Sequence, residues 1–231
     1  MPPKAGTMNH FMTKSPNEIF YPLSQTMPEK SVHNVPKRML DVIVAIGLTI
    51  ILSPLLLIIG VLIKLDSAGP VIFKQTRVGK DGRLFEMWKL RSFCVDAEEQ
   101  REKLETKNEM EGGVIFKMRN DPRLTRIGRY IRKASIDEIP QLWNVLTGEM
   151  SMVGPRPPLP GEVERYLPGE RKRLAALPGI TCVWQVSGRS EIPFKKQVEM
   201  DIAYIQSQSL KLDVVLLIRT IPAVLSGRGA Y

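Results

Sequence analysis

The longest apolar run of the chain covers residues 42–63, VIVAIGLTIILSPLLLIIGVLI, and contains no charged residue. As a helix it would measure roughly 33 Å, which is long enough to cross a bilayer. Ser53-Pro54 interrupts the run at its centre, where a proline removes a helical hydrogen bond and bends the helix. Two arrangements stay open: a single span, or a re-entrant helix broken at Ser53 and Pro54.

Basic residues flank this run on both sides, with Lys37 and Arg38 before it and Lys64 and Arg77 after it. Lysine and arginine concentrate on the cytoplasmic side of membrane segments, and a straight span would leave one basic flank outside. A helix that enters and leaves by the same face keeps both flanks inside. The pattern therefore favours a re-entrant helix over 37–66, and either arrangement leaves the remainder of the chain in the cytoplasm.

The pattern changes after the apolar run, where VIFKQTRVG and LFEMWKLRSF alternate and are separated by the turn signal Gly-Lys-Asp-Gly. We predict a β-hairpin close to the membrane surface. Apolar residues at helical spacing over 138–147, closed by Gly148, predict an amphipathic helix. Further helices are expected at 96–111, 123–133, 162–176 and 195–208. The last segment, LDVVLLIRTIPAVL, is too short for a span and suits either an interfacial or a core helix.

Composition narrows the choice of partners. The net charge is +9 and the pI about 9.6, which implies nucleic acid, an anionic bilayer or phosphate-rich substrates, and the apolar run favours the bilayer. Cys94 and Cys182 form no disulfide or zinc pattern. His10 and His33 lie in a tail, residues 1–36, that we expect to be disordered or loosely attached, so histidine catalysis is not expected. No phosphate-binding glycine fingerprint is present.

The densest group of candidate catalytic residues is RYIRKASIDEIPQ, residues 129–141. One interpretation is structural: Ser135 and Glu138 have capping-box spacing. The other is chemical: of Asp137 and Glu138, one carboxylate could attack phosphorus while the other holds Mg²⁺, a cation that prefers carboxylate and phosphate oxygens. Arg132 and Lys133 would then offset the repulsion between a carboxylate and a pyrophosphate.

Two further groups support phosphate chemistry, although solvated surface charge is the alternative for each. Lys89 and Arg91 stand at i, i+2, on one face of a strand. Arg156 lies in the stiff loop Gly-Pro-Arg-Pro, where a preorganised guanidinium binds phosphate with little entropy loss. A third, polar and aromatic wall for sugar or nucleotide is predicted from Thr181, Trp184, Gln185 and Arg189.

Residues 37–231 resemble the bacterial sugar transferases, the monotopic polyprenyl-phosphate hexose-1-phosphate transferases. The resemblance rests on KRMLDVIVA, the Ser53-Pro54 break, VIFKQTRVG, WKLRSF, DPRLTRIGRYIRKASIDEIPQLWNVLTGEMSMVGPRP, PGITCVWQVSGR and TIPAVLSGRGAY. It implies an α+β, mainly helical fold: a re-entrant helix over 37–66 and a cytosolic catalytic domain over 67–231, with membrane-surface amphipathic helices around the site. The ending is most similar to enzymes that begin exopolysaccharide synthesis with galactose-1-phosphate.

The resemblance also implies a reaction. Asp137 would be the nucleophile, forming a covalent phosphosugar intermediate and releasing UMP, and Glu138 would help Asp137 to hold Mg²⁺. Arg132 and Arg156 would contact phosphate. The donor would be a UDP-sugar, carrying galactose or glucose, and the acceptor undecaprenyl phosphate, at the cytoplasmic face of the bacterial inner membrane. A homo-oligomer stays open, and Leu177 departs from the family pattern in the wall that reads the sugar.

Two other classes of function are compatible with parts of the pattern. A membrane phosphohydrolase could also form an aspartyl-phosphate, but the chain lacks the DxD motif typical of such enzymes. A basic membrane scaffold or nucleic-acid-binding protein would fit the net charge. We do not expect nucleic acid as a partner, because acidic residues stand at the centre of the basic group rather than outside it.

Overall fold

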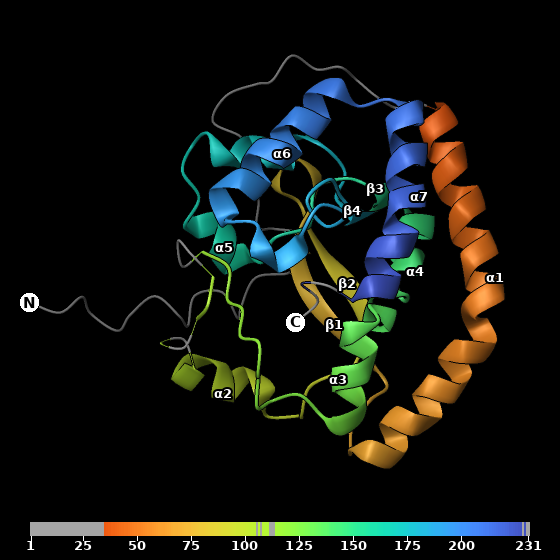
Figure 1. Cartoon of the computed structure of the whole chain (residues 1–231), viewed down its shortest axis with the longest axis vertical. Helices are drawn as coiled ribbons and strands as arrows, with labels where there is room; N and C mark the ends of the chain where they lie inside the picture. Colours follow the sequence, from red (N-terminus) through yellow and green to blue (C-terminus); the bar gives the residue numbers. More distant parts are fainter. Residues whose placement is uncertain (1–34, 105, 107, 111–113, 228, 230–231) are drawn as a thin grey trace, which may run out of the picture.

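The computed structural model describes residues 35–231 apart from 105, 107, 111–113, 228 and 230–231 (Figure 1). The expected tail, residues 1–36, therefore lies outside the described residues except for Val35 and Pro36, which begin the first helix. The mainly helical α+β class is confirmed. In chain order, with η for a 3₁₀ turn, the elements are α1 (Val35–Asp66), β1 (Ile72–Val78), η2 (Lys80–Gly82), β2 (Leu84–Leu90), α2 (Ala97–Leu104), α3 (Arg126–Lys133), η4 (Ile136–Glu138), α4 (Gln141–Thr147), β3 (Ser151–Val153), α5 (Pro160–Glu164), η5 (Glu170–Ala175), β4 (Gly179–Thr181), η6 (Arg189–Glu191), α6 (Phe194–Ser207) and α7 (Leu210–Ser226).

Helix α1 runs through Pro54 as one element and follows a bowed path along one side of the molecule (Figure 1). Proline cannot donate to the carbonyl four residues earlier, which here belongs to Ile50. The Ser53 hydroxyl donates to that carbonyl at 2.9 Å, so a side chain replaces the lost bond. Within the described part of the chain, α1 is the one helix with the length and composition to cross a membrane. A re-entrant course remains a prediction.

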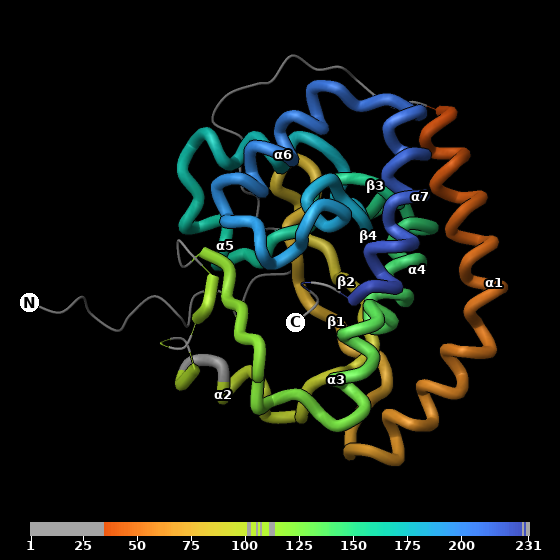
Figure 2. The backbone as a smooth tube through the Cα atoms, in the orientation of Figure 1, coloured from red at the N-terminus to blue at the C-terminus, as the bar shows by residue number. Residues whose placement is uncertain are grey.

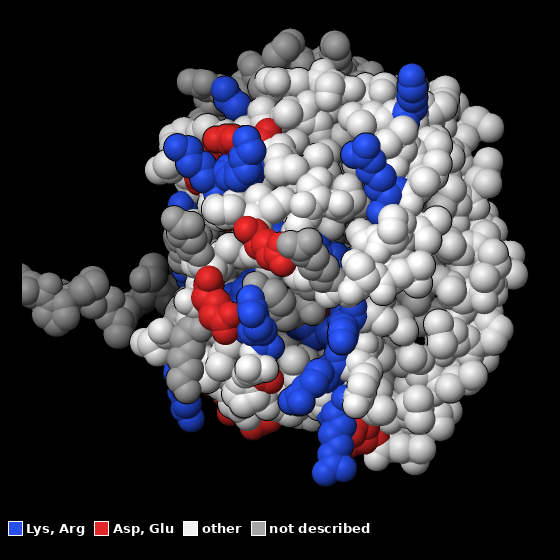
Figure 3. Space-filling view, in the orientation of Figure 1, with Lys and Arg blue, Asp and Glu red and all other residues white. Residues whose placement is uncertain are grey.

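Both halves of α1 pack against the same body, which lies on one side of the helix (Figure 2). In the first half, Ala45 is fully buried in a core cluster that includes Val145 of α4. In the second half, Ile63 is buried with Ile131 of α3. Between them the helix is open, and Ile51 is 71% exposed. Figure 3 shows that the side of the molecule formed by α1 and α7 carries few charged side chains.

The basic residues at the start of α1 are bonded to the domain rather than left for lipid headgroups. Lys37 Nζ lies 2.7 Å from Asp213 Oδ2 of α7 and donates to the Val153 carbonyl of β3 at 3.0 Å. The Tyr204 hydroxyl of α6 donates to the other Asp213 oxygen at 2.6 Å. Arg38 donates to two carbonyls at the end of α4, at 2.6 and 3.0 Å. The basic flank therefore attaches α1 to the rest of the domain, a role that the number of basic residues in the sequence does not indicate.

Two small sheets organise the rest of the fold. The predicted hairpin is confirmed: β1 and β2 are antiparallel, with Ile72 opposite Leu90 and Val78 opposite Leu84. A second, unpredicted sheet pairs β3 with β4 in parallel. It fixes the loop that begins at Gly154, where an added Cβ would lie 2.3 Å from a backbone carbonyl oxygen. The close approach of these two chain segments therefore requires glycine.

Several predicted helices differ from the observed ones. The helix expected over 162–176 is wrong, because Pro168 and Gly169 separate α5 from η5. The helix expected over 138–147 begins only at Gln141, after the separate turn η4. Helix α6 confirms the element expected over 195–208. Helix α7 is in part a core helix, since Leu216 is buried, whereas Ile218 and Leu225 on its outer face are exposed; an interfacial position remains a prediction.

Candidate active site

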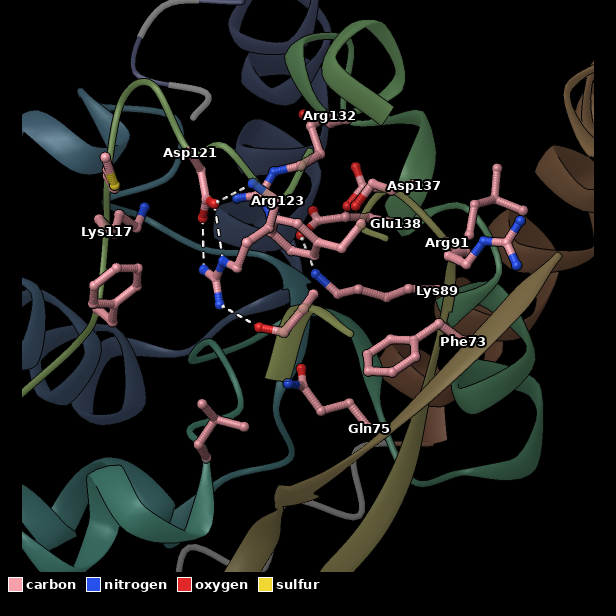
Figure 4. Close-up of a pocket in the computed structure, with 18 of the residues that line it drawn as sticks. Phe73, Gln75, Lys89, Arg91, Lys117, Asp121, Arg123, Arg132, Asp137 and Glu138 are labelled. Carbon is pink, nitrogen blue, oxygen red and sulfur yellow. Dashed lines mark hydrogen bonds and ion pairs between the residues drawn. The ribbon is translucent and has the colours of Figure 1, made fainter. Parts of the chain in front are cut away.

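A cavity of about 370 Å³ opens between the hairpin, the end of α3, η4 and the loops on either side of β4. The face of the hairpin directed into it includes Phe73, Gln75 and Lys89 (Figure 4). Asp137 and Glu138 enter from η4, and Arg156 from the loop after β3. Residues far apart in the chain therefore line one pocket, which mixes apolar surface with converging charges, as ligand sites commonly do.

The two carboxylates reach the cavity because the chain reverses between α3 and α4. Ser135 has φ 55°, a left-handed conformation that costs a non-glycine residue free energy and is frequent at functional sites. Its side chain makes no capping bond, so the capping box expected from Ser135 and Glu138 is wrong. The reversal places Asp137 and Glu138 on a 3₁₀ turn, and leaves the Glu138 carboxylate available to Lys89.

Lys89 is the direct partner of the carboxylate pair. Its Nζ lies 3.1 Å from Glu138 Oε1, and both side chains are largely buried. Arg132 comes from the last turn of α3, and its guanidinium lies 4.8 Å from the centre of the Phe93 ring. Arg156 donates to the buried Glu162 at 3.5 Å. Cations from three separate elements therefore surround the carboxylates, and their contact with phosphate remains a prediction.

The two carboxylates are in different electrostatic states. Burial raises the pKa of Asp137, which is 7% exposed; Lys89 lowers it, and the charge of Glu138 raises it further. Burial also acts to raise the pKa of Glu138, but its bonded neighbour Lys89, with Arg156 and Arg189, more than offsets burial and holds that pKa below its ordinary value. Neighbouring acids with opposed pKa shifts are typical of sites in which two carboxylates have different tasks.

Arg91 borders the cavity but its guanidinium is directed away from the carboxylates, toward the end of α1 (Figure 4). Its Nη2 donates to the Ser67 carbonyl at 2.7 Å and the Ser67 hydroxyl at 3.0 Å. Strand β2 ends at Leu90, so the face shared by i and i+2 does not extend to Arg91. A cation suits the carbonyl end of a helix, and this orientation does not favour the predicted phosphate contact.

The predicted sugar or nucleotide wall is assembled in part. Trp184, Gln185 and Arg189 line the cavity. Thr181 is buried elsewhere, with its hydroxyl 2.7 Å from the hydroxyl of Thr220 in α7. The last residue of β4 therefore faces α7 and the core, and not the pocket. A short segment with no regular period does not reveal such a direction in the sequence.

The family model described as Bacterial sugar transferase matches residues 32–227. The chain belongs to the bacterial sugar transferase family. It is 44% identical over 202 residues to Galactosyl transferase CpsE of Streptococcus agalactiae serotype III, covering 87% of this chain and 44% of that protein. It is 41% identical over 198 residues to Undecaprenyl-phosphate galactose phosphotransferase of Salmonella typhimurium, covering 84% and 41%. The chain thus spans less than half the length of these two relatives.

One relative has the same extent as this bacterial sugar transferase. Exopolysaccharide production protein ExoY of Sinorhizobium fredii is 36% identical over 222 residues, covering 95% of this chain and 98% of that protein.

Lys117 also lines the cavity of this bacterial sugar transferase, although the sequence pattern did not indicate it. Its Nζ donates to the Ser190 hydroxyl, which in turn donates to the Gly229 carbonyl at 2.9 Å. Burial, with the charges of Arg156 and Arg132, lowers the pKa of Lys117 to about 7, against the opposing effect of Glu138. Lys117 follows a glycine break in a segment without period, so only the tertiary structure brings it beside the other cations.

Arg123 is a second cavity residue that the sequence pattern did not indicate, and hydrogen bonds fix the position of its guanidinium. Its guanidinium donates to both carboxylate oxygens of Asp121, at 2.9 and 2.6 Å, and to the Ala97 carbonyl at 3.1 Å. The same group lies 5.0 Å from the ring of Phe93, which also contacts Arg132. The Asp-Pro-Arg spacing in the sequence could have indicated this pair. Arg123 therefore helps to position Phe93, the ring that the Arg132 guanidinium also contacts.

Proposed function

We propose that this chain transfers galactose-1-phosphate from UDP-galactose to undecaprenyl phosphate at the cytoplasmic face of the inner membrane, as the first step of exopolysaccharide or O-antigen assembly. The observation that carries the proposal is the pair of the buried Asp137 and the partly buried Glu138, surrounded by cations, in a cavity beside the end of an apolar helix. Relatives at 44%, 42% and 41% identity have names that refer to galactose, and relatives at 40% and 36% have names that refer to glucose, so similarity favours galactose.

In the first half-reaction, an Asp137 carboxylate oxygen attacks the phosphorus that bears the sugar. The bond from that phosphorus to the bridging oxygen breaks, and UMP leaves with the electron pair. Lys89 bonds the neighbouring Glu138, and Arg132 and Arg156 line the same cavity, so each can offset charge on the phosphates. The product is a covalent phosphosugar on Asp137.

In the second half-reaction, a phosphate oxygen of undecaprenyl phosphate attacks the same phosphorus. The bond to Asp137 breaks, the carboxylate is regenerated, and the sugar leaves as a lipid-linked pyrophosphate. No water is consumed, and the cavity has to exclude it. Burial of Asp137 meets this requirement because it keeps water from the carboxylate. A less hydrated carboxylate is also a better nucleophile.

The chemistry of the carboxylate pair is compatible with Mg²⁺, the cofactor predicted from the sequence. Among the described residues, no cluster of three or more acidic, histidine or cysteine side chains is present to form an all-protein metal cage. Mg²⁺ is usually bound by one or two carboxylates and completed by substrate phosphates and water, which Asp137 and Glu138 can satisfy. When bound, the ion would neutralise charge on the phosphate oxygens.

Packing of α1 supports a re-entrant course in the membrane. Lys37 near the start of the helix and Ile63 near its end both contact the one domain, and the exposed apolar residues lie between them. A straight span would carry one of these contacts to the far side of the bilayer, where the domain cannot follow. A shallow entry and return near Pro54 keeps both contacts on the cytoplasmic side.

The decisive experiment compares Asp137→Asn with Asp81→Asn as a matched control. Asp81 lies in the hairpin turn at φ 56°, a conformation that asparagine tolerates. Membranes containing each variant are incubated with UDP-galactose, with and without undecaprenyl phosphate. We expect Asp137→Asn to abolish UMP release and lipid labelling while Asp81→Asn retains both.

Two results would contradict the proposal. Normal transfer by a folded Asp137→Asn variant would exclude Asp137 as the nucleophile. Continuous release of free sugar phosphate without the lipid would identify a phosphohydrolase. A panel of other UDP-sugars in the same assay tests the choice of galactose.

A further inference from the structure

The cavity wall changes from charged to apolar along β1. Side chains alternate along a strand, so Arg77, Gln75 and Phe73 share one face. Arg77 donates to the Pro157 carbonyl at 2.9 Å and lies at the inner, polar end. Phe73 lies at the other end and pairs directly with Lys89 in the register of the hairpin. An aromatic ring is therefore placed beside the lysine that bonds Glu138.

The apolar surface continues from Phe73 to the end of α1. Pro70 and Val95 line the same cavity, and Val95 is 74% exposed. Beneath them Leu90 is buried against the last turns of α1. Leu65 in that last turn is 79% exposed, and Pro70, in the segment that directly follows α1, lines the cavity. Exposed apolar groups of this kind mark a surface that a ligand covers.

We propose that Phe73, Pro70 and Val95 bind the first isoprene units of the polyprenyl phosphate acceptor, so that its phosphate reaches the carboxylates beside Lys89. This inference rests on the proposed function. It orients both substrates: the lipid enters from the α1 end, and the nucleotide occupies the charged end. An isoprenyl chain is favoured over a polar ligand because contact with these side chains removes apolar area from water on both partners.

One other occupant would use the same ring. A uracil base could stack on Phe73, which is 36% exposed. The two occupants belong to different half-reactions: uracil acts before UMP is released, and the isoprenyl chain acts afterwards. Kinetics of the separate half-reactions therefore distinguish them.

The test uses Phe73→Ser and Val95→Asn, with Phe73→Leu as the apolar replacement. Leu167→Ser is the matched control, because Leu167 is 67% exposed but lies outside the cavity lining. The single-turnover release of UMP without acceptor should be unchanged in all four variants. The KM for both geranyl phosphate and undecaprenyl phosphate should rise about tenfold in Phe73→Ser, the size expected when part of a phenylalanine contact is lost. Phe73→Leu and Leu167→Ser should stay close to wild type.

A direct binding measurement separates this proposal from the proposed function. Isothermal titration of the detergent-solubilised protein with geranyl phosphate does not require turnover, and affinity should fall in Phe73→Ser and Val95→Asn. If the wild-type protein releases no UMP but these variants still lose binding, the proposed reaction fails and the acceptor surface stands. Unchanged affinity and KM in both variants, or slower UMP release in Phe73→Ser, would overturn the acceptor surface. The second of these results would indicate uracil stacking.

Discussion

The buried ion pair that attaches α1 to the domain supports a quantitative prediction. Lys37→Met removes the ammonium that lies 2.7 Å from Asp213 Oδ2 and leaves that carboxylate buried, with its side chain 1% exposed. The Tyr204 hydroxyl still donates to the other oxygen, but it carries no charge. Removing one partner of a buried pair costs about 3–5 kcal/mol of unfolding free energy. For a chain of this size, that loss lowers the melting temperature by roughly 6–20 °C.

The measurement is thermal unfolding of the detergent-solubilised protein, followed by circular dichroism. Lys196→Met provides the control, because Lys196 and Glu199 form a 3.0 Å pair whose side chains are 63% and 53% exposed. Exposed pairs contribute at most about 1 kcal/mol. The double variant Lys37→Met with Asp213→Leu removes both charges, and should recover part of the loss from Lys37→Met.

Equal stability of Lys37→Met and Lys196→Met, or simple additivity of the two substitutions in the double variant, would contradict a strong buried ion pair. The same pair affects the site as well, because Lys37 also donates to Val153, the residue before the loop that carries Arg156. Loss of the anchor should therefore weaken transfer at temperatures at which the variant is still folded.

Three further predictions concern the site. Because burial and its cationic neighbours lower the pKa of Lys117 to about 7, its ammonium loses charge as the pH rises through that value. The kcat/KM for the UDP-sugar should therefore fall above about pH 7, and Lys117→Arg should move the fall to higher pH; an identical profile would exclude a phosphate contact by Lys117. Gly154→Ala places a methyl group 2.3 Å from a carbonyl oxygen and should cost about 1–3 kcal/mol, whereas Gly161→Ala meets nothing within 4 Å and should be neutral by thermal unfolding. Chelation of divalent cations should stop transfer, and Mg²⁺ should restore it; full activity in chelator would contradict the metal assignment.

Elements with a strong local signal were predictable from the sequence. The apolar run with its Ser-Pro interruption, the hairpin around its glycine turn, and the helix over 195–208 each follow from composition and periodicity within a short window. Predictions were wrong where one local sequence pattern is compatible with two different structures. Ser135 and Glu138 have the spacing of a capping box, but Ser135 adopts a left-handed conformation that no window of residues indicates.

The candidate site shows a similar division. Side-chain chemistry and the resemblance to known enzymes were enough to select Asp137, Glu138, Lys89 and Arg156, which the fold brings to one cavity. Neither could indicate whether an isolated side chain points into the cavity or away from it. That depends on where a strand ends and on which part of the core the residue faces.

The apolar segment, the basic balance and the pair of neighbouring acids can be read from the sequence alone, because these are properties of residues and their spacing. The fold was needed to show that Lys37 and Arg91 bind the two ends of α1, and that Lys117 lines the cavity. Each of these contacts joins segments that are distant along the chain, and burial strengthens the electrostatic interactions that the charged groups make. Such contacts are set by packing, which no local pattern encodes.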